Sequence, residues 1–189
     1  MRYQKLSRFR VPAGFRGRNA IWVQLWWIVQ SSLFAWSPQF AYKWRNWLLR
    51  LFGAKIGTGV VIRPTVKITY PWKLTIGDYA WVGDEAELYT LGEITIGNNA
   101  VVSQKCYLCT GSHDFEVETF DIYAKPIVIE PEAWLATDVF VAPGITIGEG
   151  ALIGARSSVF ENMPSGMICL GYPAKPIKKR PISNKLNTN

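Results

Sequence analysis

The sequence predicts an all-β solenoid, a parallel β-helix, because its aliphatic residues recur at every sixth position. From residue 129 onward these positions are Ile129, Leu135, Val141, Ile147, Ile153 and Val159. A helix would place apolar residues about 3.6 positions apart, and an ordinary strand would place one at every second position. A period of six instead fits a coil with three flat faces, in which each six-residue unit forms one face and its aliphatic side chain points to the axis. Such a coil has about 18 residues, and neighbouring coils stack about 4.8 Å apart.

A second regular position supports this interpretation, because a small or modest side chain stands four residues after each aliphatic one. These residues are Ala133, Val139, Ile145, Ala151 and Ser157. The same spacing begins at Ile56, and Gly often follows the aliphatic residue directly, as in Ile147-Gly148. We therefore expect a β-helix domain over residues 56–163, followed by a C-terminal segment over residues 164–189.

Interruptions of the spacing predict loops that leave the corners of the coil. The intervals 68–76 and 88–96 have eight residues instead of six, and the interval 108–129 has 21, which is three more than a full coil. A stacked solenoid accepts such insertions as loops at a corner. The longest predicted loop, residues 109–126, contains His113, the only histidine in the chain.

The first 55 residues are expected to form a basic, aromatic arm and two helices. One apolar run extends from Ile21 to Trp36 and is ended by Pro38; a second helix is predicted from Gln39 to Phe52. Four residues of the second helix form one apolar stripe: Trp44, Trp47, Leu48 and Leu51. The first run, about 16 residues, is shorter than the roughly 20 apolar residues of a membrane span. Two interpretations stay open: the helices cap the open end of the solenoid, or their Trp and Arg side chains contact a membrane surface.

Charge is divided unevenly along the chain, which carries a formal net charge of +7. Residues 1–77 contain 13 Lys and Arg and no acidic residue, whereas residues 78–189 contain 8 Lys and Arg and all 14 Asp and Glu. A basic amino-terminal segment is attracted to anionic surfaces. We expect peripheral membrane contact through residues 1–52 as one possibility, and no nucleic-acid partner.

Cysteine usage and the amino-terminal sequence indicate a reducing compartment. Three cysteines do not suggest a disulfide framework, and the chain does not begin with the usual layout of a secretory signal peptide. The expected location is cytoplasmic, with the inner face of the cell membrane as the alternative. The pair Cys106 and Cys109 is interpreted as structural, because Cys106 fills an inward position of the repeat and no second pair exists. No metal site is predicted.

Three motifs accompany the repeat: Gly111-Ser112-His113-Asp114-Phe115 in the long loop, Ala133-Trp134 at the next coil, and Gly171-Tyr172-Pro173-Ala174-Lys175-Pro176-Ile177 near the end. With them, residues 56–180 resemble the hexapeptide-repeat acyltransferases, and most closely the colanic acid biosynthesis O-acetyltransferase group. The resemblance implies a left-handed β-helix, although crossovers in parallel sheets are usually right-handed. It also implies acetyl-CoA as the acyl donor, a saccharide or lipid-linked saccharide as the acceptor, and a homotrimer with its active sites between subunits.

The resemblance implies that His113 is the general base of a direct acyl transfer. A sugar hydroxyl is a poor nucleophile, so its proton must leave as the oxygen attacks the thioester, and a neutral imidazole is suited to accept it. Asp114 is a candidate to orient the ring. The backbone N–H of Thr137 is expected to stabilise the oxyanion, and Ala155 to contact the pantetheine arm.

The remaining site residues each carry an alternative. Trp134 matches a family tryptophan beside the pantetheine arm, or it packs at a subunit seam. Four cations near the carboxyl end are expected to contact the coenzyme A phosphates, or they form a solvated tail: Lys175, Lys178, Lys179 and Arg180. Asp84 and Glu85 lie near the acceptor position of the family, or they are corner turn residues. This chain has Gly83-Asp84 where related sugar acetyltransferases have asparagine, which leaves the acceptor open.

Other functions known for this fold differ from sugar O-acetylation in the residues that they require. A small-molecule acetyltransferase of the serine or xenobiotic type would share the fold, but the long helical domain expected of serine acetyltransferases is not present. A γ-type carbonic anhydrase binds zinc through three histidines, and one histidine per chain does not build that site. A non-catalytic β-helix assembly subunit is the third alternative, and the intact loop around His113 argues against it.

Overall fold

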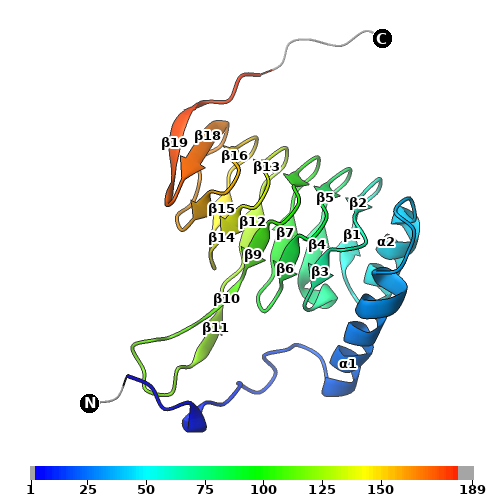
Figure 1. Ribbon diagram of the computed structural model, residues 1–189, viewed down its shortest axis with the longest axis vertical. Coiled ribbons are helices and arrows are strands. Elements are labelled where there is room, and N and C mark those ends of the chain that lie inside the picture. Colours follow the sequence, from blue (N-terminus) through cyan, green and yellow to red (C-terminus); the bar gives the residue numbers. More distant parts are fainter. Residues whose placement is uncertain (1–2, 183–189) are drawn as a thin grey trace.

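The computed structural model describes residues 3–182, which fold as the predicted left-handed parallel β-helix (Figure 1). Three parallel sheets form its faces. Sheet A contains β1 (Lys55–Ile56), β4 (Leu74–Ile76), β7 (Ile94–Ile96), β12 (Ile127–Ile129) and β15 (Thr146–Ile147). Sheet B contains β2 (Val61–Ile62), β5 (Trp81–Val82), β8 (Val101–Val102), β13 (Trp134–Leu135), β16 (Leu152–Ile153), β18 (Met167–Gly171) and β19 (Ala174–Lys179). Sheet C contains β3 (Lys67–Ile68), β6 (Glu87–Tyr89), β9 (Tyr107–Cys109), β14 (Phe140–Val141) and β17 (Ser158–Val159).

The residues of the six-residue period form continuous columns inside the coil. In sheet A, Ile76 pairs with Ile96, Ile96 with Ile129, and Ile129 with Ile147, and all four side chains are buried. The small residues lie inside the corners, where Ala133 and Ala151 are fully buried. The period therefore determines the core of the solenoid, and the cap adds Trp26, Phe34 and Leu49 to it at the amino-terminal end.

Most corners from sheet A to sheet B and from sheet B to sheet C turn through the left-handed backbone region. Most of these positions are held by residues other than glycine, and φ lies between 55° and 62° at Tyr79, Glu85, Asn99, Lys105, Glu132, Asp138 and Arg156. The turns from sheet B to sheet C, which we call the B–C edge, stack one above another along the molecule. A ligand lying along this edge would therefore meet equivalent turns at every coil.

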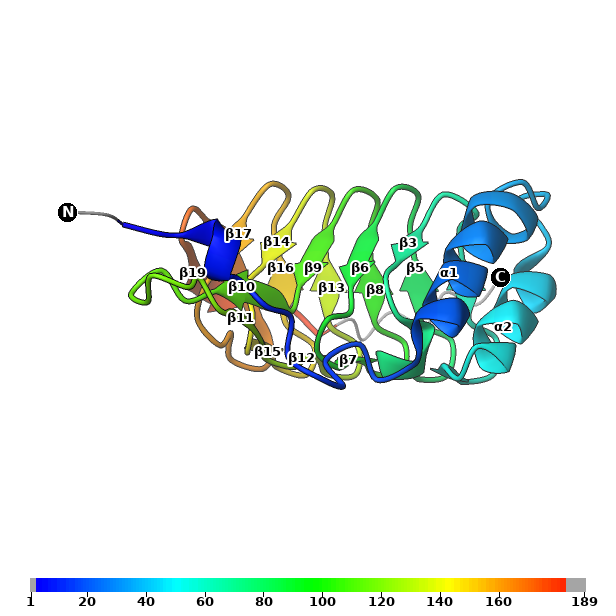
Figure 2. The same ribbon diagram turned by 90° about the horizontal axis from the view of Figure 1, so that it is seen from below.

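The insertions leave the solenoid at the corner between sheets C and A. The first forms a short 3-10 helix, Pro71–Lys73. The longest forms an antiparallel hairpin of β10 (Gly111–His113) and β11 (Ile122–Ala124), which projects from the body of the molecule (Figures 1 and 2). Strands β9 and β12 nevertheless stay in register with their neighbours, because the hairpin begins and ends at the same corner.

Helices α1 (Ala20–Val29) and α2 (Tyr42–Leu51), joined through a π-helical turn (Gln30–Phe34), close the amino-terminal end of the solenoid. Their side chains donate to carbonyl groups of the first coil. Trp26 Nε1 reaches Ile68 O at 2.7 Å, Arg45 Nε reaches Ile62 O at 2.7 Å, and Asn46 Nδ2 reaches Val60 O at 2.9 Å. Without these donors, the carbonyls would be unpaired at the open edge of the first coil. Capping this edge is therefore one role of the helices.

The buried side of α2 differs from the predicted apolar stripe. Leu48 is buried as expected, but Trp44 and Trp47 are exposed, while Arg45 and Leu49 on the other side are fully buried. Polar donors face the solenoid because the first coil presents carbonyl groups there. Within residues 3–182, no helix is both long and apolar enough to cross a membrane.

The amino-terminal arm, residues 3–19, runs outside the solenoid from α1 to the β10–β11 hairpin (Figures 1 and 2). It contains a 3-10 turn, Leu6–Arg8. Trp72 Nε1 donates to Arg16 O at 2.7 Å near its middle, and Lys5 N donates to Glu118 O at 2.7 Å at the hairpin. The arm thereby links the cap to the loop that carries the only histidine.

Candidate active site

His113 lies at the end of β10, with one ring nitrogen bonded and the other free. Its Nδ1 lies 2.8 Å from the carbonyl oxygen of Phe120. A carbonyl can only accept a hydrogen bond, so the neutral ring carries its proton on Nδ1 and a lone pair on Nε2. Among residues 3–182, Nε2 has no hydrogen-bond partner. The geometry therefore gives a base whose tautomer is fixed by the hairpin itself.

Two aromatic rings contact the imidazole. Phe120 stacks on it, with ring centroids 4.3 Å apart and planes inclined by 8°, and Phe9 of the amino-terminal arm lies 5.6 Å away at 55°. Two contacts with Glu118 hold this part of the arm in place: the backbone N–H of Lys5 donates to Glu118 O, and the Arg8 side chain forms an ion pair of 3.7 Å with the Glu118 carboxylate. The ring plane is therefore set by both the hairpin and the arm.

Asp114 does not contact the imidazole. Its Oδ1 accepts the N–H of Glu116 at 2.9 Å, and its own N–H donates to Asp121 O at 2.8 Å. The residue stabilises the turn of the hairpin, and the carbonyl of Phe120 takes the orienting position that the sequence suggested for Asp114. Beside it lies a hollow of about 450 Å³, lined by His113, Asp114, Phe115, Glu116, Asp121, Ile122, Tyr123 and Lys125.

The predicted donor contacts Thr137 and Ala155 occupy equivalent turns of the B–C edge, one coil apart. Strands β13 and β16, which precede these turns, are directly paired. The backbone N–H groups of Thr137 and Ala155 have no acceptor within residues 3–182. Two N–H groups at coil spacing, about 4.8 Å, are thus available to oxygen atoms of a ligand.

Asp84 and Glu85 lie in the same row of turns, nearer the cap. Asp84 accepts from Arg63 Nε at 3.1 Å and from Thr65 Oγ1 at 2.9 Å, and Glu85 lies 4.0 Å from Lys105. Glu85 has φ 57°. Both residues therefore belong to the corner, and both remain exposed enough to meet a ligand along the B–C edge.

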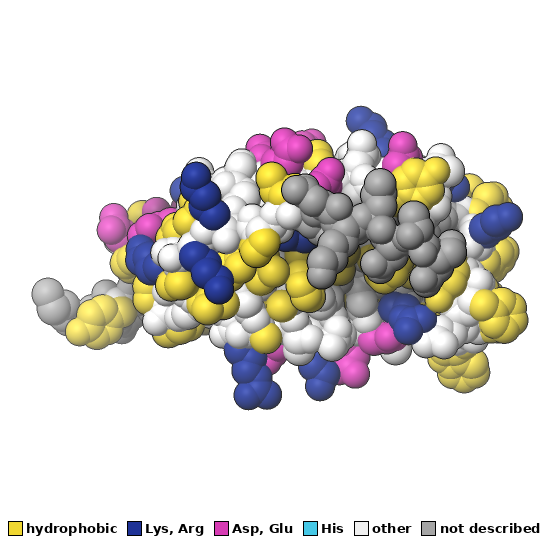
Figure 3. Space-filling model, turned by 90° about the horizontal axis from the view of Figure 1, so that it is seen from above, with side chains coloured by type: hydrophobic (Ala, Val, Ile, Leu, Met, Phe, Trp, Pro, Cys, Tyr) yellow, Lys and Arg dark blue, Asp and Glu magenta, His cyan; other side chains and the backbone are white. Residues whose placement is uncertain are grey.

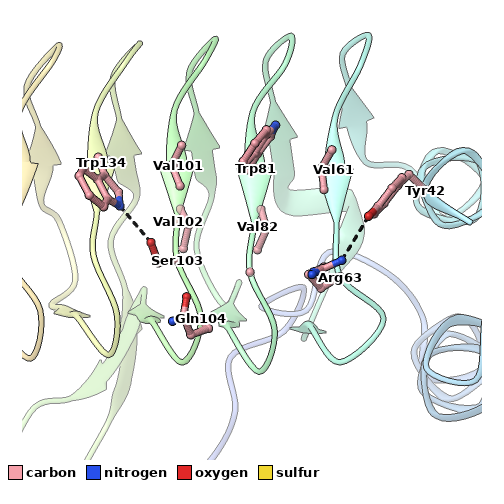
Figure 4. Close-up of a pocket in the computed structure, with 11 residues that line it drawn as sticks. Tyr42, Val61, Arg63, Trp81, Val82, Val101, Val102, Ser103, Gln104 and Trp134 are labelled. Carbon is pink, nitrogen blue, oxygen red and sulfur yellow. Dashed lines mark hydrogen bonds between the residues drawn. The ribbon is translucent and has the colours of Figure 1, made fainter. Parts of the chain in front are cut away.

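A trough of about 590 Å³ follows the outer surface of sheet B beside this edge (Figure 4). Trp134 and Trp81 lie along it on either side of Val101, in the same column of paired strands. The indole N–H of Trp134 donates to Ser103 Oγ at 3.0 Å, which holds the ring across the trough. At the end of the trough next to the cap, Arg63 Nη1 donates to the hydroxyl of Tyr42 at 3.2 Å. The other residues that line the trough include Val61, Val82, Gly83, Val102 and Gln104.

The four predicted phosphate contacts are not gathered into one cluster. Lys175 lies near the turn between β18 and β19 and pairs with Glu161 at 3.0 Å. Lys178 and Lys179 are exposed further along β19. Arg180 lies at the opposite edge of sheet B, where its Nη1 donates to Glu132 O and Gly150 O, each at 3.0 Å.

The predicted base and the predicted backbone donors thus fall on two different corners of one chain. Asp84, Thr137 and Ala155 share the B–C edge, whereas His113 leaves the corner between sheets C and A. The width of sheet C lies between these corners. One chain therefore does not bring its imidazole to its own free N–H groups.

Three neighbouring residues were missed by sequence reasoning. Phe9 and Phe120 contact the imidazole through the arm and the hairpin, and no periodicity marks them. Trp81 could have been found, because the repeat places it one coil from Val101 and in the same column as Trp134.

Cys106 is buried in the core, and burial raises the pKa of its thiol to about 11, as expected of a structural cysteine.

Comparisons with known proteins agree with this geometry. The chain is 68% identical over 177 residues to the colanic acid biosynthesis acetyltransferase WcaF of Escherichia coli K12, covering 94% of this chain and 97% of that protein. No protein-family profile matches the chain. The fold matches a hexapeptide-repeat acetyltransferase of Vibrio cholerae complexed with acetyl coenzyme A, with TM-score 0.78, 22% identity and coverage of 88% and 92% of the two chains. It also matches a galactoside acetyltransferase in complex with coenzyme A, with TM-score 0.78, 23% identity and coverage of 89% and 83%.

The relative from Escherichia coli matches 94% of the chain, so the match includes the helices and not only the repeat. An acetyltransferase fits a chain that carries one imidazole with a free nitrogen and a row of unpaired backbone N–H groups. The chain belongs to the family of colanic acid biosynthesis acetyltransferases and is an acetyltransferase.

Proposed function

We propose that the protein transfers an acetyl group from acetyl-CoA to a hydroxyl of a saccharide in exopolysaccharide biosynthesis, with His113 as the general base. The observation that carries the proposal is the fixed tautomer of His113, with Nδ1 on the Phe120 carbonyl and Nε2 free. The related protein from Escherichia coli acts in colanic acid biosynthesis according to its name, and the fold is shared with acetyltransferases bound to acetyl-CoA or coenzyme A.

In this proposal Nε2 of His113 accepts the hydroxyl proton as the acceptor oxygen attacks the thioester carbonyl carbon. The Phe120 carbonyl keeps its bond to Nδ1 and thereby stabilises the imidazolium that forms. The N–H of Thr137 stabilises the negative charge on the former carbonyl oxygen. When the carbon–sulfur bond breaks, the proton passes from Nε2 to the sulfur, and the imidazole is neutral again.

We further propose a homotrimer in which neighbouring subunits complete each active site. His113 and the B–C edge lie on different corners, and three-fold packing of triangular prisms brings a corner of one chain to a corner of the next. Acetyl-CoA would lie along the B–C edge. Thr137 would be at its acyl end, and Ala155 would be beside its pantetheine arm. Trp134 would line the arm, and Lys175 or Lys178 would meet the phosphates. Arg180 is less suited to the phosphates, because its guanidinium already binds two backbone carbonyls.

The acceptor is proposed to be a saccharide on a lipid carrier. Asp84 and Glu85 offer carboxylates to sugar hydroxyls along the B–C edge, and Trp81 offers an aromatic face in the trough beside it. An acceptor on a lipid stays at the membrane, which places the enzyme at the inner face of the cell membrane in this proposal.

The proposal is tested by replacing His113 with Ala and with Gln. Loss of a general base should lower kcat by about 100-fold to 10,000-fold, with little change in the KM for acetyl-CoA. Acetyl transfer to the saccharide is followed by thiol release and by mass spectrometry of the product. Asp114→Asn is the matched control in the same turn, and we expect it to keep most of the activity. Wild-type turnover in His113→Ala would show that the base is another group.

A further inference from the structure

Helix α1 is apolar on both of its sides. Its ten residues include no charged side chain. Val23 and Trp26 are fully buried against the solenoid, whereas Ile21, Leu25 and Ile28 form a stripe on the outside, with 81%, 42% and 63% of their surfaces exposed. A helix at a water-facing surface normally carries polar residues on its outer side, so this stripe is suited to a second apolar environment.

The apolar surface extends into the segment that joins the helices. Leu33, Trp36 and Trp44 line an apolar hollow of about 440 Å³, and Trp36 is 87% exposed. The Trp44 indole donates to Leu33 O at 3.0 Å, which fixes the wall of the hollow. We call the exposed apolar side chains at this end the cap face: Ile21, Leu25, Ile28, Leu33, Trp36 and Trp44. Figure 3 shows hydrophobic side chains protruding at the helical end of the molecule, with a basic side chain beside them.

The border of the cap face is cationic. No acidic residue occurs in the first 77 positions. Arg18 precedes the stripe of α1 and Lys43 lies on α2, and both are exposed. Within residues 3–182 neither of them forms a salt bridge. Arg50 of α2 is exposed too, but its guanidinium already donates to Ile56 O and Gly57 O. Two copies of the face would bring these cations together, which disfavours self-association through it.

We propose that the cap face docks onto an anionic lipid surface. Apolar side chains of α1 and the exposed indoles would enter the boundary between headgroups and acyl chains, and the bordering Lys and Arg would meet anionic headgroups. The biological purpose of the docking rests on the proposed lipid-linked acceptor, whereas the docking itself follows from the exposed residues. It would hold the active-site grooves near acceptors that do not leave the membrane.

The test is flotation of the purified full-length protein with lipid vesicles. We expect it to float with vesicles of phosphatidylcholine and phosphatidylglycerol in equal parts, and much less with phosphatidylcholine alone. Binding should weaken as salt rises, because the screening length falls from about 10 Å at 0.1 M to about 3 Å at 1 M. The double variant Ile21→Ser/Ile28→Ser should lower the vesicle-bound fraction roughly tenfold or more.

A matched control is available at the opposite end of the molecule. Ile177 and Ile182 are also exposed, and Ile177→Ser/Ile182→Ser should float like the wild type. Equal flotation of both double variants, or no flotation of the wild-type protein at low salt, would overturn the proposal. A cap-face variant that changes the oligomer mass in light scattering, without changing flotation, would identify the face as a protein contact instead.

Activity toward a soluble acceptor separates this proposal from the proposed function. Ile21→Ser/Ile28→Ser should keep wild-type transfer to a soluble saccharide while losing flotation. Flotation with no transfer by the wild-type protein to any saccharide would overturn the proposed reaction and leave the docking standing. Transfer without flotation would overturn the docking alone.

Discussion

The imidazole of His113 is held by groups from two distant parts of the chain. Phe120 supplies both a stacked ring and the carbonyl on Nδ1, and it belongs to the same hairpin. Phe9 comes from the amino-terminal arm, which is fixed to the hairpin through Lys5 and Arg8. We infer that Phe9 is a positioning residue, since its ring packs beside the imidazole, with centroids 5.6 Å apart, and carries no group that transfers a proton.

Replacing Phe9 with Ala should lower kcat by about tenfold, because the ring gains freedom to leave the reactive orientation. The KM for acetyl-CoA should change little, since the proposed donor contacts lie on another corner. Steady-state kinetics with each substrate varied in turn measure both quantities.

Phe9→Leu should recover most of the lost kcat, because it restores an apolar side chain of similar reach. Tyr3→Ala, at an exposed position of the same arm, is the control for general effects of altering the arm. A rise in the KM for acetyl-CoA beside the fall in kcat, both unrelieved by Phe9→Leu, would assign Phe9 to folding of the arm instead.

The sequence could identify His113, because a single histidine in the longest insertion stands out. It could not identify Phe9, since 104 positions separate the two residues and no repeat relates them. It offered Asp114 only as a candidate orienting group, because a carboxylate is visible in a sequence and a backbone carbonyl is not. Backbone partners are present at every residue, so only the folded hairpin selects Phe120.

The helical cap depends on a buried cation. Arg45 is fully buried, and its guanidinium donates to the carbonyls of Ile62, Pro38 and Gln39 and to Ser37 Oγ. One side chain therefore satisfies the edge of the first coil and the turn before α2. Removing it takes the side-chain donor from the buried carbonyl of Ile62 and from the part-buried carbonyl of Gln39.

We expect Arg45→Leu to lower the free energy of unfolding by about 3 kcal/mol or more. Urea denaturation followed by circular dichroism, at one fixed protein concentration, measures the change. Lys43→Leu on the same helix removes an exposed cation and should change stability by no more than about 0.5 kcal/mol. Equal losses in the two variants would mean that the Arg45 bonds do not stabilise the cap.

The existence of both helices was predictable from apolar runs and their flanking residues, but the side of α2 that packs was not. A stripe of Trp and Leu predicts an apolar partner, and Leu48 follows that expectation. The first coil instead offers a row of carbonyls, so Arg45 and Asn46 face it and the tryptophans face outward. Such a match between polar groups appears only when both elements are in place.

At the scale of the whole molecule, the six-residue period was enough to predict the solenoid and its core. Each aliphatic residue of the period lies in the interior, because the repeat fixes both the fold and the register. The division of the chain at residues 55 and 163 stays a prediction. The distribution of site residues over two corners could not be foreseen, since spacing does not state which corner faces a neighbouring subunit.

Mixed trimers test whether two chains build each active site. His113→Ala removes the base, and Thr137→Pro removes the proposed oxyanion donor while suiting the turn, because Pro64 already occupies the equivalent position of the first coil. Each variant alone should be inactive. Co-expressed in equal amounts, they should regain about a quarter of the wild-type activity, since a site needs an intact base from one chain and an intact N–H from the next.

Light scattering should show that the co-expressed variants form trimers, and differently tagged copies should be purified together. Mixed trimers without activity would mean that both groups act from one chain. A monomer at assay concentration with full wild-type activity would remove the need for a neighbour.

The two ends of the solenoid are closed by different structures: helices cover the strands of the first coil, and β19 runs antiparallel to β18 at the other end. At the helical end, the carbonyls of Val60, Ile62 and Ile68 already accept hydrogen bonds from the cap, so they are not free to pair with a strand of another molecule. Proteolytic removal of the helices would leave these carbonyls unpaired and give a foreign strand an edge to pair with.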